Sequence, residues 1–428
     1  MDSKQELERT YVLCYNLNIV QESELKYMAI SKSSNDFYKN TIAAFFSGVG
    51  GIELGFEQTG NFKVMYANEF DKNAQITFQE NHPDILLDTR DIHNINELDV
   101  PETEIIVGGF PCQAFSIAGY RKGFEDERGD LFFELLRIIK SKQPRALFIE
   151  NVKNMVSHDQ GNTFKVIREA LNQNGYHIKW KVMNGKDYGN VPQNRERIYI
   201  VGFKDIKSFN NFSFPNPIEL TESLSNIIDY NTKMDEIYYY RKNKQPFYDI
   251  LKSDILNQNK VYQWRRKYVR ENKSGVVPTL TANMGTGGHN VPLILTKNGI
   301  RKLTPRETFN AQGFPPNFKL PSNMSNAQLY KQAGNSVVVP VIKRIANNIA
   351  SAIKHTTNNL FSYENTAEYS ITFTTMNGKF DGESFVVENF NSLSDLQSYS
   401  SHNHINFIST EEYKRALKNN KHISFYSY

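Results

Sequence analysis

Apolar and amphipathic segments alternate between Thr41 and Gly202, and this alternation is the strongest constraint on the fold. Residues 41–46, 63–70, 104–110, 146–152, 178–184 and 197–203 have the apolar composition of β-strands. Between them, residues 129–142 and 163–174 carry apolar side chains at helical spacing. Strands that alternate with helices predict an α/β fold: a doubly wound, mostly parallel sheet with helices on both faces.

The alternation stops near Gly202, and the chain up to about Ile300 is polar, basic and aromatic without a clear period. We therefore expect a smaller domain inserted between two parts of one α/β domain. The predicted boundaries are an N-terminal extension at 1–40, a main domain at 41–203, the inserted domain at 204–329, a return to the main domain at 330–354 and an accessory tail at 355–428. The helical period of residues 341–354 closes the main domain.

The tail has local signals of its own. Asn377-Gly378 lies between two strand-like segments, which predicts a β-hairpin. Ser409 and Glu412 have the spacing of a capping box and predict the start of a helix.

Positive charge is concentrated in one segment, although the formal net charge of the chain is only +4. Residues 241–273 contain ten Lys and Arg side chains against three carboxylates, interleaved with Tyr262, Trp264 and Tyr268. A basic and aromatic stretch suits a polyanionic partner. The alternative is an ordinary solvated surface.

The sequence gives no sign of a membrane segment or of a metal site. The N-terminus is charged without an apolar signal core, and no apolar run approaches the roughly 20 residues that span a bilayer. The two cysteines, Cys14 and Cys112, suggest neither a disulfide framework nor a zinc site. We expect a cytoplasmic protein without a metal.

The first predicted strand runs into SGVGG, Ser47 to Gly51, where glycines allow a ligand close to the backbone and to a helix N-terminus. The spacing is not the dinucleotide fingerprint, because Glu53 stands where the third glycine belongs. Glu69 ends the next strand, where a carboxylate can accept the ribose hydroxyls of a nucleoside. Phe70 can stack on an adenine, and Asp91 ends the following segment. Taken singly, acids at strand ends are often helix caps.

Cys112 follows Pro111 at the carboxyl end of a predicted strand, where open α/β sheets bind their ligands. A thiol in this place can act as a nucleophile. The segment GFPCQAFS, residues 109–116, resembles the catalytic motif of the cytosine-5 DNA methyltransferases, mostly bacterial and phage enzymes of restriction–modification systems.

The resemblance covers residues 41–354, and its motifs occur in the order of the family: FFSGVGG, YANEFD, RGDLFF, ENVKN, QNRERIYIVGF, RKLTPRE, QGFP and YKQAGNSV. One departure is Ala44, where the family usually has Asp. The resemblance implies a Rossmann-like fold that binds S-adenosylmethionine and methylates C5 of a cytosine flipped out of double-stranded DNA. The residues expected at the cofactor are Phe46, Gly48, Gly50, Gly51, Glu69, Phe70, Asp91, Ile92, Gly109, Pro111, Asn335 and Ser336.

The implied chemistry assigns roles to five further side chains. A thiolate of Cys112 adds to C6, and a protonated Glu150 donates to N3, which requires a raised pKa. Arg197, and by resemblance Arg195, bind the O2 side of the base, although both could instead be surface ion-pair residues. Asn151 orients the loop that carries Cys112.

The inserted domain is expected to contact DNA, and residues 265–290 resemble the target-recognition region of the family. Thr279 and Leu280 match its Thr-Leu pair near the phosphates. His289, in a glycine-rich loop, is a candidate base reader, with a plain turn as the alternative. The full set of expected DNA contacts is Gln113, Arg265, Arg266, Thr279, Leu280 and His289.

Two other functions were weighed. A tRNA cytosine-5 methyltransferase shares the ENV and cofactor motifs, but its catalytic stretch departs from GFPCQAFS. A DNA-binding regulator without catalysis does not require Cys112, Glu150 and Arg197 to be intact. The favoured expectation is a monomeric DNA methyltransferase that protects host DNA from a cognate restriction endonuclease without forming a stable complex with it.

Overall fold

The computed structural model describes residues 39–111, 131–286, 290–361, 369–375, 384–390 and 422–427. The chain divides into two compact units, Met1–Ile353 and Lys354–Tyr428.

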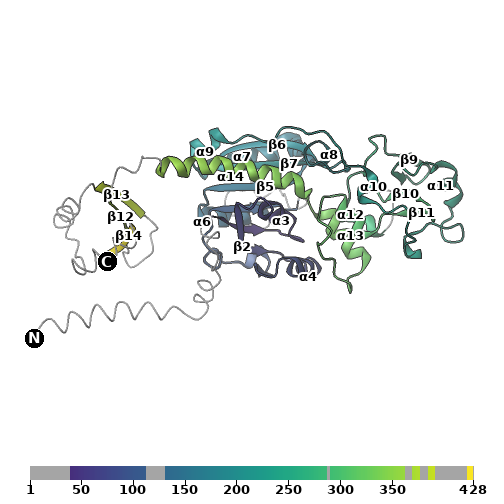
Figure 1. The fold of residues 1–428 in the computed structure, drawn as a ribbon, viewed down its shortest axis with the longest axis horizontal. Helices are drawn as coiled ribbons and strands as arrows, with labels where there is room; N and C mark the ends of the chain where they lie inside the picture. The colour runs from purple at the N-terminus through teal and green to yellow at the C-terminus, as the bar shows by residue number, and fades with distance from the viewer. Residues whose placement is uncertain are drawn as a thin grey trace, which may run out of the picture. The chain divides into compact units, whose positions relative to one another are not determined.

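The larger unit is built on a seven-stranded sheet (Figure 1). Its strands are β1 (Asn40–Phe45), β2 (Phe62–Asn68), β3 (Leu86–Asp88), β4 (Ile105–Gly108), β5 (Ala146–Val152), β6 (His177–Asn184) and β7 (Glu196–Phe203). The spatial order is β3-β2-β1-β4-β5-β7-β6. Neighbours from β3 to β5 are parallel, whereas β7 runs antiparallel to both β5 and β6.

Helices cover both faces of this sheet because successive strand residues point to opposite sides. In β1, Ile42 and Ala44 belong to one buried core, and Ala43 and Phe45 belong to the other. The first core includes side chains of α3 (Gly51–Glu57), α4 (Lys72–Asn81) and α14 (Val339–Phe361); in Figure 1, α3 and α14 lie over the same part of the sheet. The second core includes α6 (Leu131–Lys142) and α7 (Asn162–Gln173). The predicted doubly wound α/β fold is confirmed.

The α14 helix is a core element. Among the described residues, the stretch Asn326–Lys354 is long and apolar enough to cross a membrane by length and composition alone. However, 67% of its apolar window is buried inside the protein, and Ile342, Ile345 and Ile349 are fully buried in the first core. This packing against the sheet explains its apolar character.

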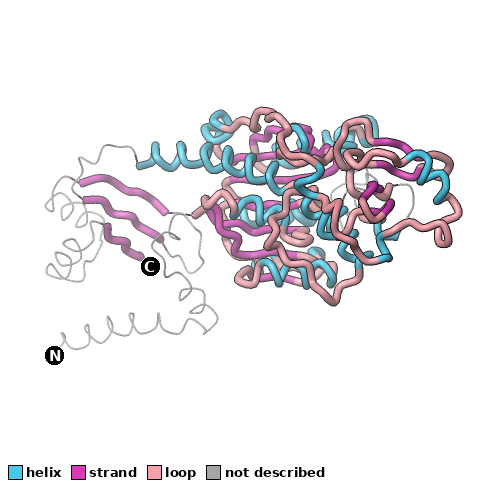
Figure 2. The backbone as a smooth tube through the Cα atoms, turned by 45° about the vertical axis from the view of Figure 1, so that its right-hand side comes forward, coloured by secondary structure: helices cyan, strands magenta, loops and turns pink. Residues whose placement is uncertain are grey.

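A second, smaller sheet follows the main one in the chain (Figure 2). It has the order β11-β10-β8-β9 and consists of β8 (Tyr262–Trp264), β9 (Val269–Glu271), β10 (Pro292–Thr296) and β11 (Gly299–Lys302), all paired antiparallel. Its core includes Leu251, Ile255 and Leu293. The other α-helices among the described residues of the larger unit are α8 (Gly185–Tyr188), α9 (Ile206–Asn211), α10 (Leu224–Ile227), α11 (Tyr248–Asp254), α12 (Pro305–Asn310) and α13 (Asn326–Asn335).

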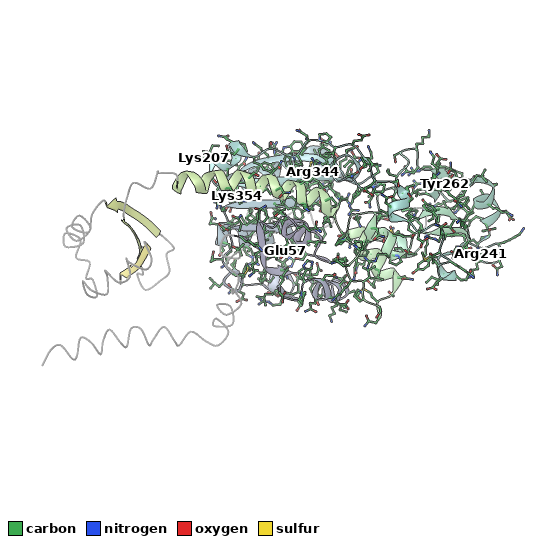
Figure 3. The ribbon with its side chains drawn as sticks, viewed as in Figure 1. Glu57, Lys207, Arg241, Tyr262, Arg344 and Lys354 are labelled. Carbon is green, nitrogen blue, oxygen red and sulfur yellow. The ribbon has the colours of Figure 1, made fainter. Side chains whose placement is uncertain are left out.

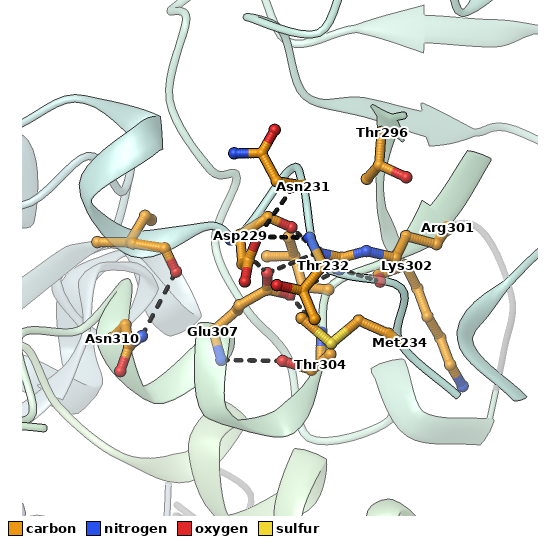
Figure 4. Close-up of polar contacts among 12 residues, drawn as sticks. Asp229, Asn231, Thr232, Met234, Thr296, Arg301, Lys302, Thr304, Glu307 and Asn310 are labelled. Carbon is orange, nitrogen blue, oxygen red and sulfur yellow. Dashed lines mark hydrogen bonds and ion pairs between the residues drawn. The ribbon is translucent and has the colours of Figure 1, made fainter. Parts of the chain in front are cut away.

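A buried ion pair fixes the junction between this small sheet and α12 (Figure 4). Both terminal nitrogens of Arg301 donate to Glu307 at 2.7 Å, and Arg301 also donates to the carbonyl of Asp229. Glu307 in turn accepts from the backbone N–H groups of Thr304 and Asp229, so its carboxylate is fully hydrogen-bonded. Thr304 completes a capping box at the start of α12.

The second unit contains a three-stranded sheet of β12 (Tyr369–Thr375), β13 (Ser384–Phe390) and β14 (His422–Ser427). β12 pairs antiparallel with β13, which is the pairing that a hairpin requires, and the Asn377-Gly378 turn itself lies outside the described residues. The parallel pairing of β14 with β12 was not predicted. The helix expected after Ser409 also lies outside the described residues.

Candidate active site

A cavity of about 690 Å³ opens at the carboxyl ends of β1, β2, β4 and β5. This is where open α/β sheets bind their ligands. Residues of four segments that are distant in the sequence line it: 46–49 with 51–52, 68–71 with 74, 109–111, and 331–332 with 334–337. Glu150, Asn151, Arg195 and Arg197 also line it, so the expected cofactor residues and the expected base-binding residues share one cavity.

The glycine loop forms one wall of this cavity. Gly48 has φ +58° and Gly50 has φ +85°, backbone conformations that favour glycine. Gly50 does not line the cavity, unlike the other expected cofactor residues. A Cβ atom at Gly50 would lie 2.2 Å from Nε2 of the buried His82, so this glycine allows the loop to pack against the end of α4.

Glu69 braces the same wall of the cavity, next to the glycine loop. One carboxylate oxygen accepts from the backbone N–H of Gly48 at 2.7 Å, and the other accepts from that of Asp71 at 2.6 Å. Burial raises the pKa of Glu69, and these N–H groups partly oppose the shift. Each oxygen keeps a lone pair for a further donor, such as a ribose hydroxyl.

Phe70 presents its ring at the cavity with 66% of its surface exposed, which is a large exposure for an aromatic side chain. Asp91 and Ile92 lie beyond it, and Asp91 caps a short helical turn through the backbone N–H of His93. Asn335 and Ser336 reach the cavity from the end of α13. The arrangement offers a carboxylate and a free aromatic face to a nucleoside.

Glu150 and Arg197 face each other in the deeper part of the cavity. Glu150 Oε1 lies 3.1 Å from Arg197 Nε, and the two side chains are 11% and 12% exposed. Burial raises the pKa of Glu150, and the charges of Arg197 and Arg195 oppose the shift. The net direction is upward, as the sequence analysis required of a proton donor.

Asn151 fixes the backbone that leads to the expected nucleophile. Its side-chain amide donates to the carbonyl of Phe110 at 2.8 Å, two residues before Cys112. Pro111, the last described residue before the catalytic loop, lines the cavity and is exposed. Cys112 and Gln113 lie outside the described residues.

Arg195 is placed differently from its expected role at the base. Although it borders the cavity, its guanidinium donates to the main-chain carbonyls of Leu280 and Gly334, each at 3.0 Å, and of Ser336. The side chain is 2% exposed, which also excludes the surface ion-pair alternative. These bonds direct it toward the protein backbone rather than toward a base.

The expected DNA-contacting residues occupy three different settings. Arg265 and Arg266 lie in the turn between β8 and β9, and Arg266 is exposed with φ +71°. The Thr279 hydroxyl donates to the carbonyl of Asn194 at 2.7 Å. His289 lies outside the described residues.

Leu280 requires a correction. Its side chain is 1% exposed and belongs to a core shared with Val277, Phe309 and Phe314. An apolar residue enclosed in this way cannot contact a phosphate, and its carbonyl already accepts a hydrogen bond from Arg195.

Several side chains of the cavity were not predicted from the sequence, among them Lys331 and Gln332. Lys331 Nζ lies 2.6 Å from Asp71 Oδ2. Gln332 accepts a hydrogen bond from the hydroxyl of Thr77 and donates one to the carbonyl of Asn73. These contacts join α13 to α4 across the edge of the cavity. The available signal was their place in YKQAGNSV, directly before the residues that had been selected.

Among the residues that the structure describes, no group of three or more His, Cys, Asp or Glu side chains has the geometry to hold a metal ion. The polar groups that line the cavity are backbone groups, four carboxyl groups, hydroxyls, amides and cations.

Residues 41–351 match the family model described as C-5 cytosine-specific DNA methylase. The type II methyltransferase M.Bsp6I of Bacillus sp. (strain RFL6) is 62% identical over 309 residues, covering 72% of this chain and 98% of that protein. M.SsoII of Shigella sonnei is 40% identical and covers 72% and 79% of the two chains, and M.HhaI of Haemophilus parahaemolyticus is 37% identical and covers 72% and 93%.

Solved structures share the fold. A putative DNA modification methyltransferase from a prophage of E. coli superposes with a TM-score of 0.53 at 24% identity, covering 74% of this chain and 100% of that one. The Entamoeba histolytica methyltransferase EhMeth gives a TM-score of 0.55 at 19% identity, covering 74% and 99%.

Proposed function

The chain belongs to the C-5 cytosine-specific DNA methylase family and is a DNA cytosine methyltransferase, and from this premise we propose its cofactor, its site residues and its mechanism. The methyl donor is S-adenosylmethionine, and the acceptor is C5 of a cytosine flipped out of double-stranded DNA. The observation that carries the proposal is the shared cavity, in which the nucleoside-binding wall and the Glu150–Arg197 pair meet.

The wall formed by the glycine loop, Glu69 and Phe70 fits the adenosine part of this cofactor. Glu69 accepts from ribose hydroxyls while Gly48 and Asp71 hold its carboxylate in place. The exposed face of Phe70 stacks on the adenine. When bound, S-adenosylmethionine supplies the methyl group that is transferred.

The chemistry at the base falls to Cys112, Glu150 and Arg197. The Cys112 thiolate forms a bond to C6, which breaks the aromaticity of the ring and makes C5 nucleophilic. Glu150, protonated because burial raises its pKa, donates to N3 as negative charge develops there. Arg197 binds the O2 side. After C5 has taken the methyl group, a base removes the C5 proton and the thiolate leaves.

Sequence specificity is assigned to residues 204–329, which contain the small sheet and the basic segment. We place the enzyme in the cytoplasm as a monomer. There it methylates host DNA at the site of a cognate restriction endonuclease, with which it forms no stable complex.

Bisulfite sequencing of plasmid DNA from cells that express the protein tests the activity. Methylated cytosines in one sequence context are expected, and the same plasmid should resist an endonuclease that cuts this context. Unmethylated plasmid from cells that contain the folded protein would refute the proposal.

The covalent step has a separate test. In a duplex with 5-fluorocytosine at the target, C5 keeps fluorine in place of the proton, so the enzyme remains bonded to the DNA after transfer. An adduct that survives boiling in detergent is expected for the wild type and for Cys14→Ala, and none for Cys112→Ala. An adduct at another residue would remove Cys112 from the mechanism, and an adduct formed only with RNA would indicate an RNA substrate.

A further inference from the structure

Arg195 connects three parts of the larger unit through its guanidinium alone. It follows the segment 192–194 and precedes β7, and it donates to the carbonyl of Leu280, 85 residues away, and to that of Gly334, 139 residues away. A third hydrogen bond reaches the carbonyl of Ser336. The two terminal nitrogens of the guanidinium thus bind two segments: the DNA-side segment, which contains Leu280, and the cofactor-side segment, which contains Gly334 and Ser336.

The DNA-side segment is attached at several residues to the segment that precedes β7 and carries Arg195. Val277 and the segment 192–194 exchange backbone hydrogen bonds: Val277 donates to Pro192 and accepts from Asn194, each at 2.8 Å. Thr279 adds its hydroxyl bond to the carbonyl of Asn194. The position of Thr279, proposed to lie at the phosphates, is therefore tied to the backbone next to Arg195.

The cofactor-side segment, residues 334–336, lines the cavity. Gly334 also touches the DNA-side segment directly, since a Cβ atom there would lie 2.3 Å from the backbone nitrogen of Ala282. Two segments that bind different ligands thus meet at one point, and the guanidinium of Arg195 lies between their carbonyls.

The chemistry of the side chain suits this junction. A guanidinium is planar and presents its donors in a fixed fork, so it specifies the relative position of the carbonyls that it binds. Lysine carries the same charge on one ammonium group that rotates freely, so it cannot hold three acceptors in a fixed geometry. The side chain is buried, so water does not replace these bonds when a segment shifts.

On the basis of the proposed function, we propose that Arg195 is a positioning residue that couples cofactor binding to DNA binding, by holding Leu280 and residues 334–336 in register. Filling the cavity orders residues 334–336, and Arg195 transmits that order to the Thr279–Leu280 segment. By linkage, DNA held at Thr279 favours the cofactor-bound arrangement by the same factor.

The test compares wild type with Arg195→Lys, using S-adenosylhomocysteine as an unreactive probe. Its dissociation constant is measured by calorimetry with and without a duplex that carries the methylated context found by bisulfite sequencing. For the wild type, the duplex is expected to tighten the probe by about 5-fold or more, a usual size for coupling between two sites. For Arg195→Lys this factor is expected to fall toward one, with KM rising for both substrates and a smaller change in kcat.

Arg344→Lys is the matched control. Arg344, labelled in Figure 3, also donates to two main-chain carbonyls, those of Tyr188 and Asn216, but it does not line the cavity. It undergoes the same chemical change and should keep the wild-type coupling factor. Equal losses of coupling in both variants would show a general loss of rigidity and would overturn the proposal.

If Arg195→Lys does not fold, Thr279→Val tests the same junction, because it removes only the hydroxyl bond to Asn194. A lower coupling factor supports the proposal. An unchanged factor in a folded variant, or a wild type without coupling, overturns it. Failure of the proposed function is a distinct result, since wild-type enzyme would then leave plasmid DNA unmethylated.

Discussion

Arg197 Nε lies 3.1 Å from Glu150 Oε1, across the antiparallel pair formed by β7 and β5. The ion pair lies in a cavity wall where both side chains are mostly buried. Burial favours the protonated carboxyl and the arginine favours the carboxylate, and burial is the larger effect. The carboxyl of Glu150 is therefore more easily protonated than a free one, which is the property that its proposed role at N3 requires.

Glu150→Gln is expected to lower the rate of methyl transfer by about 10²- to 10⁴-fold, because an amide cannot give a proton to N3. The wild-type rate should fall as the pH rises through the raised pKa of Glu150, since the protonated form is active. This falling limb should be absent from the residual activity of the variant. Single-turnover rates over a pH series measure both effects, and an identical pH profile in the variant would contradict the assignment.

Phe70→Ala is expected to weaken binding of S-adenosylhomocysteine by about 2- to 12-fold, the loss that corresponds to one aromatic stacking contact. Calorimetric titration measures the change. Leu98→Ala is the control, because Leu98 is 82% exposed and does not line the cavity. If both variants bind like the wild type, Phe70 does not stack on the adenine.

The proposed phosphate contacts of Arg265 and Arg266 predict a specific dependence on salt. Replacing both with Ala should reduce the slope of log affinity against log salt by about 1.8, because each lost phosphate contact contributes roughly 0.9. Lys165→Ala combined with Arg168→Ala removes the same charge from the exposed side of α7 and should leave the slope unchanged. Equal slopes for wild type and both double variants would place Arg265 and Arg266 away from the DNA.

Part of the basic segment is neutralised within the protein. Arg241 pairs with Glu236, Lys242 with Asp249 and Lys260 with Glu271, and Figure 3 shows Arg241 in the small domain. The sequence of this segment has ten Lys and Arg residues against three Asp and Glu residues. Because some of these cations are paired within the protein, we expect fewer phosphate contacts than that excess of positive charge implies.

Glu53 gives a prediction on stability. Its carboxyl, beneath the glycine loop and next to His82, is fully buried, and burial raises its pKa from 4.5 to about 7. In the unfolded chain Glu53 loses its proton above about pH 4.5, whereas the folded protein keeps it up to about pH 7. The contribution of Glu53 to stability is therefore complete below about pH 4.5 and is lost as the pH rises from there through about 7. Glu53→Gln removes this loss and should stabilise the folded protein by up to about 3 kcal/mol at pH 8.

Chemical denaturation at pH 5 and pH 8, without cofactor, measures this effect. The difference in stability between Glu53→Gln and wild type should be small at pH 5 and several times larger at pH 8. Glu80→Gln, at an exposed carboxylate on α4, serves as the control and should follow the wild type at both. If the difference in stability between Glu53→Gln and wild type were the same at pH 5 and pH 8, Glu53 would not titrate in this range.

Truncation after Lys354 is expected to leave the rate of methyl transfer within a few-fold of the full chain. The family match ends at residue 351, and every proposed site residue precedes it. Methylation of plasmid DNA by the purified truncated protein measures the effect. Loss of S-adenosylhomocysteine binding in a folded truncation would make the tail part of the active unit.

The main sheet could be predicted because its strands are long enough to show their pattern. Residues 146–152 and 197–203 were predicted as strands, and β5 and β7 occupy Ala146–Val152 and Glu196–Phe203. The small sheet could not be predicted, because β8 and β9 are three residues long and show no period. α14 extends on both sides of the predicted 341–354, because the helical pattern continues beyond the apolar stretch.

The members of the site could be selected from motifs, but two of their relationships could not. The reversed direction of β7 brings Arg197 beside the end of β5, and strand direction is a tertiary property. The partners of Arg195 are main-chain carbonyls, which leave no mark on residue identity at Leu280 or Ser336. The burial of Leu280 is likewise decided by the packing of the core around it.

The three hydrogen bonds from Arg195 to main-chain carbonyls have an evolutionary consequence. Every amino acid carries the carbonyl that Arg195 binds, so substitutions at 280 and 336 leave its acceptors in place. Gly334 is restricted by its close approach to Ala282, and Leu280 by the packing of its side chain in the core. The proposed recognition region, residues 204–329, can therefore diverge in sequence, or be exchanged between relatives, and still attach to the catalytic framework through the same three atoms. An enzyme assembled in this way acquires a new target without having to rebuild its chemistry.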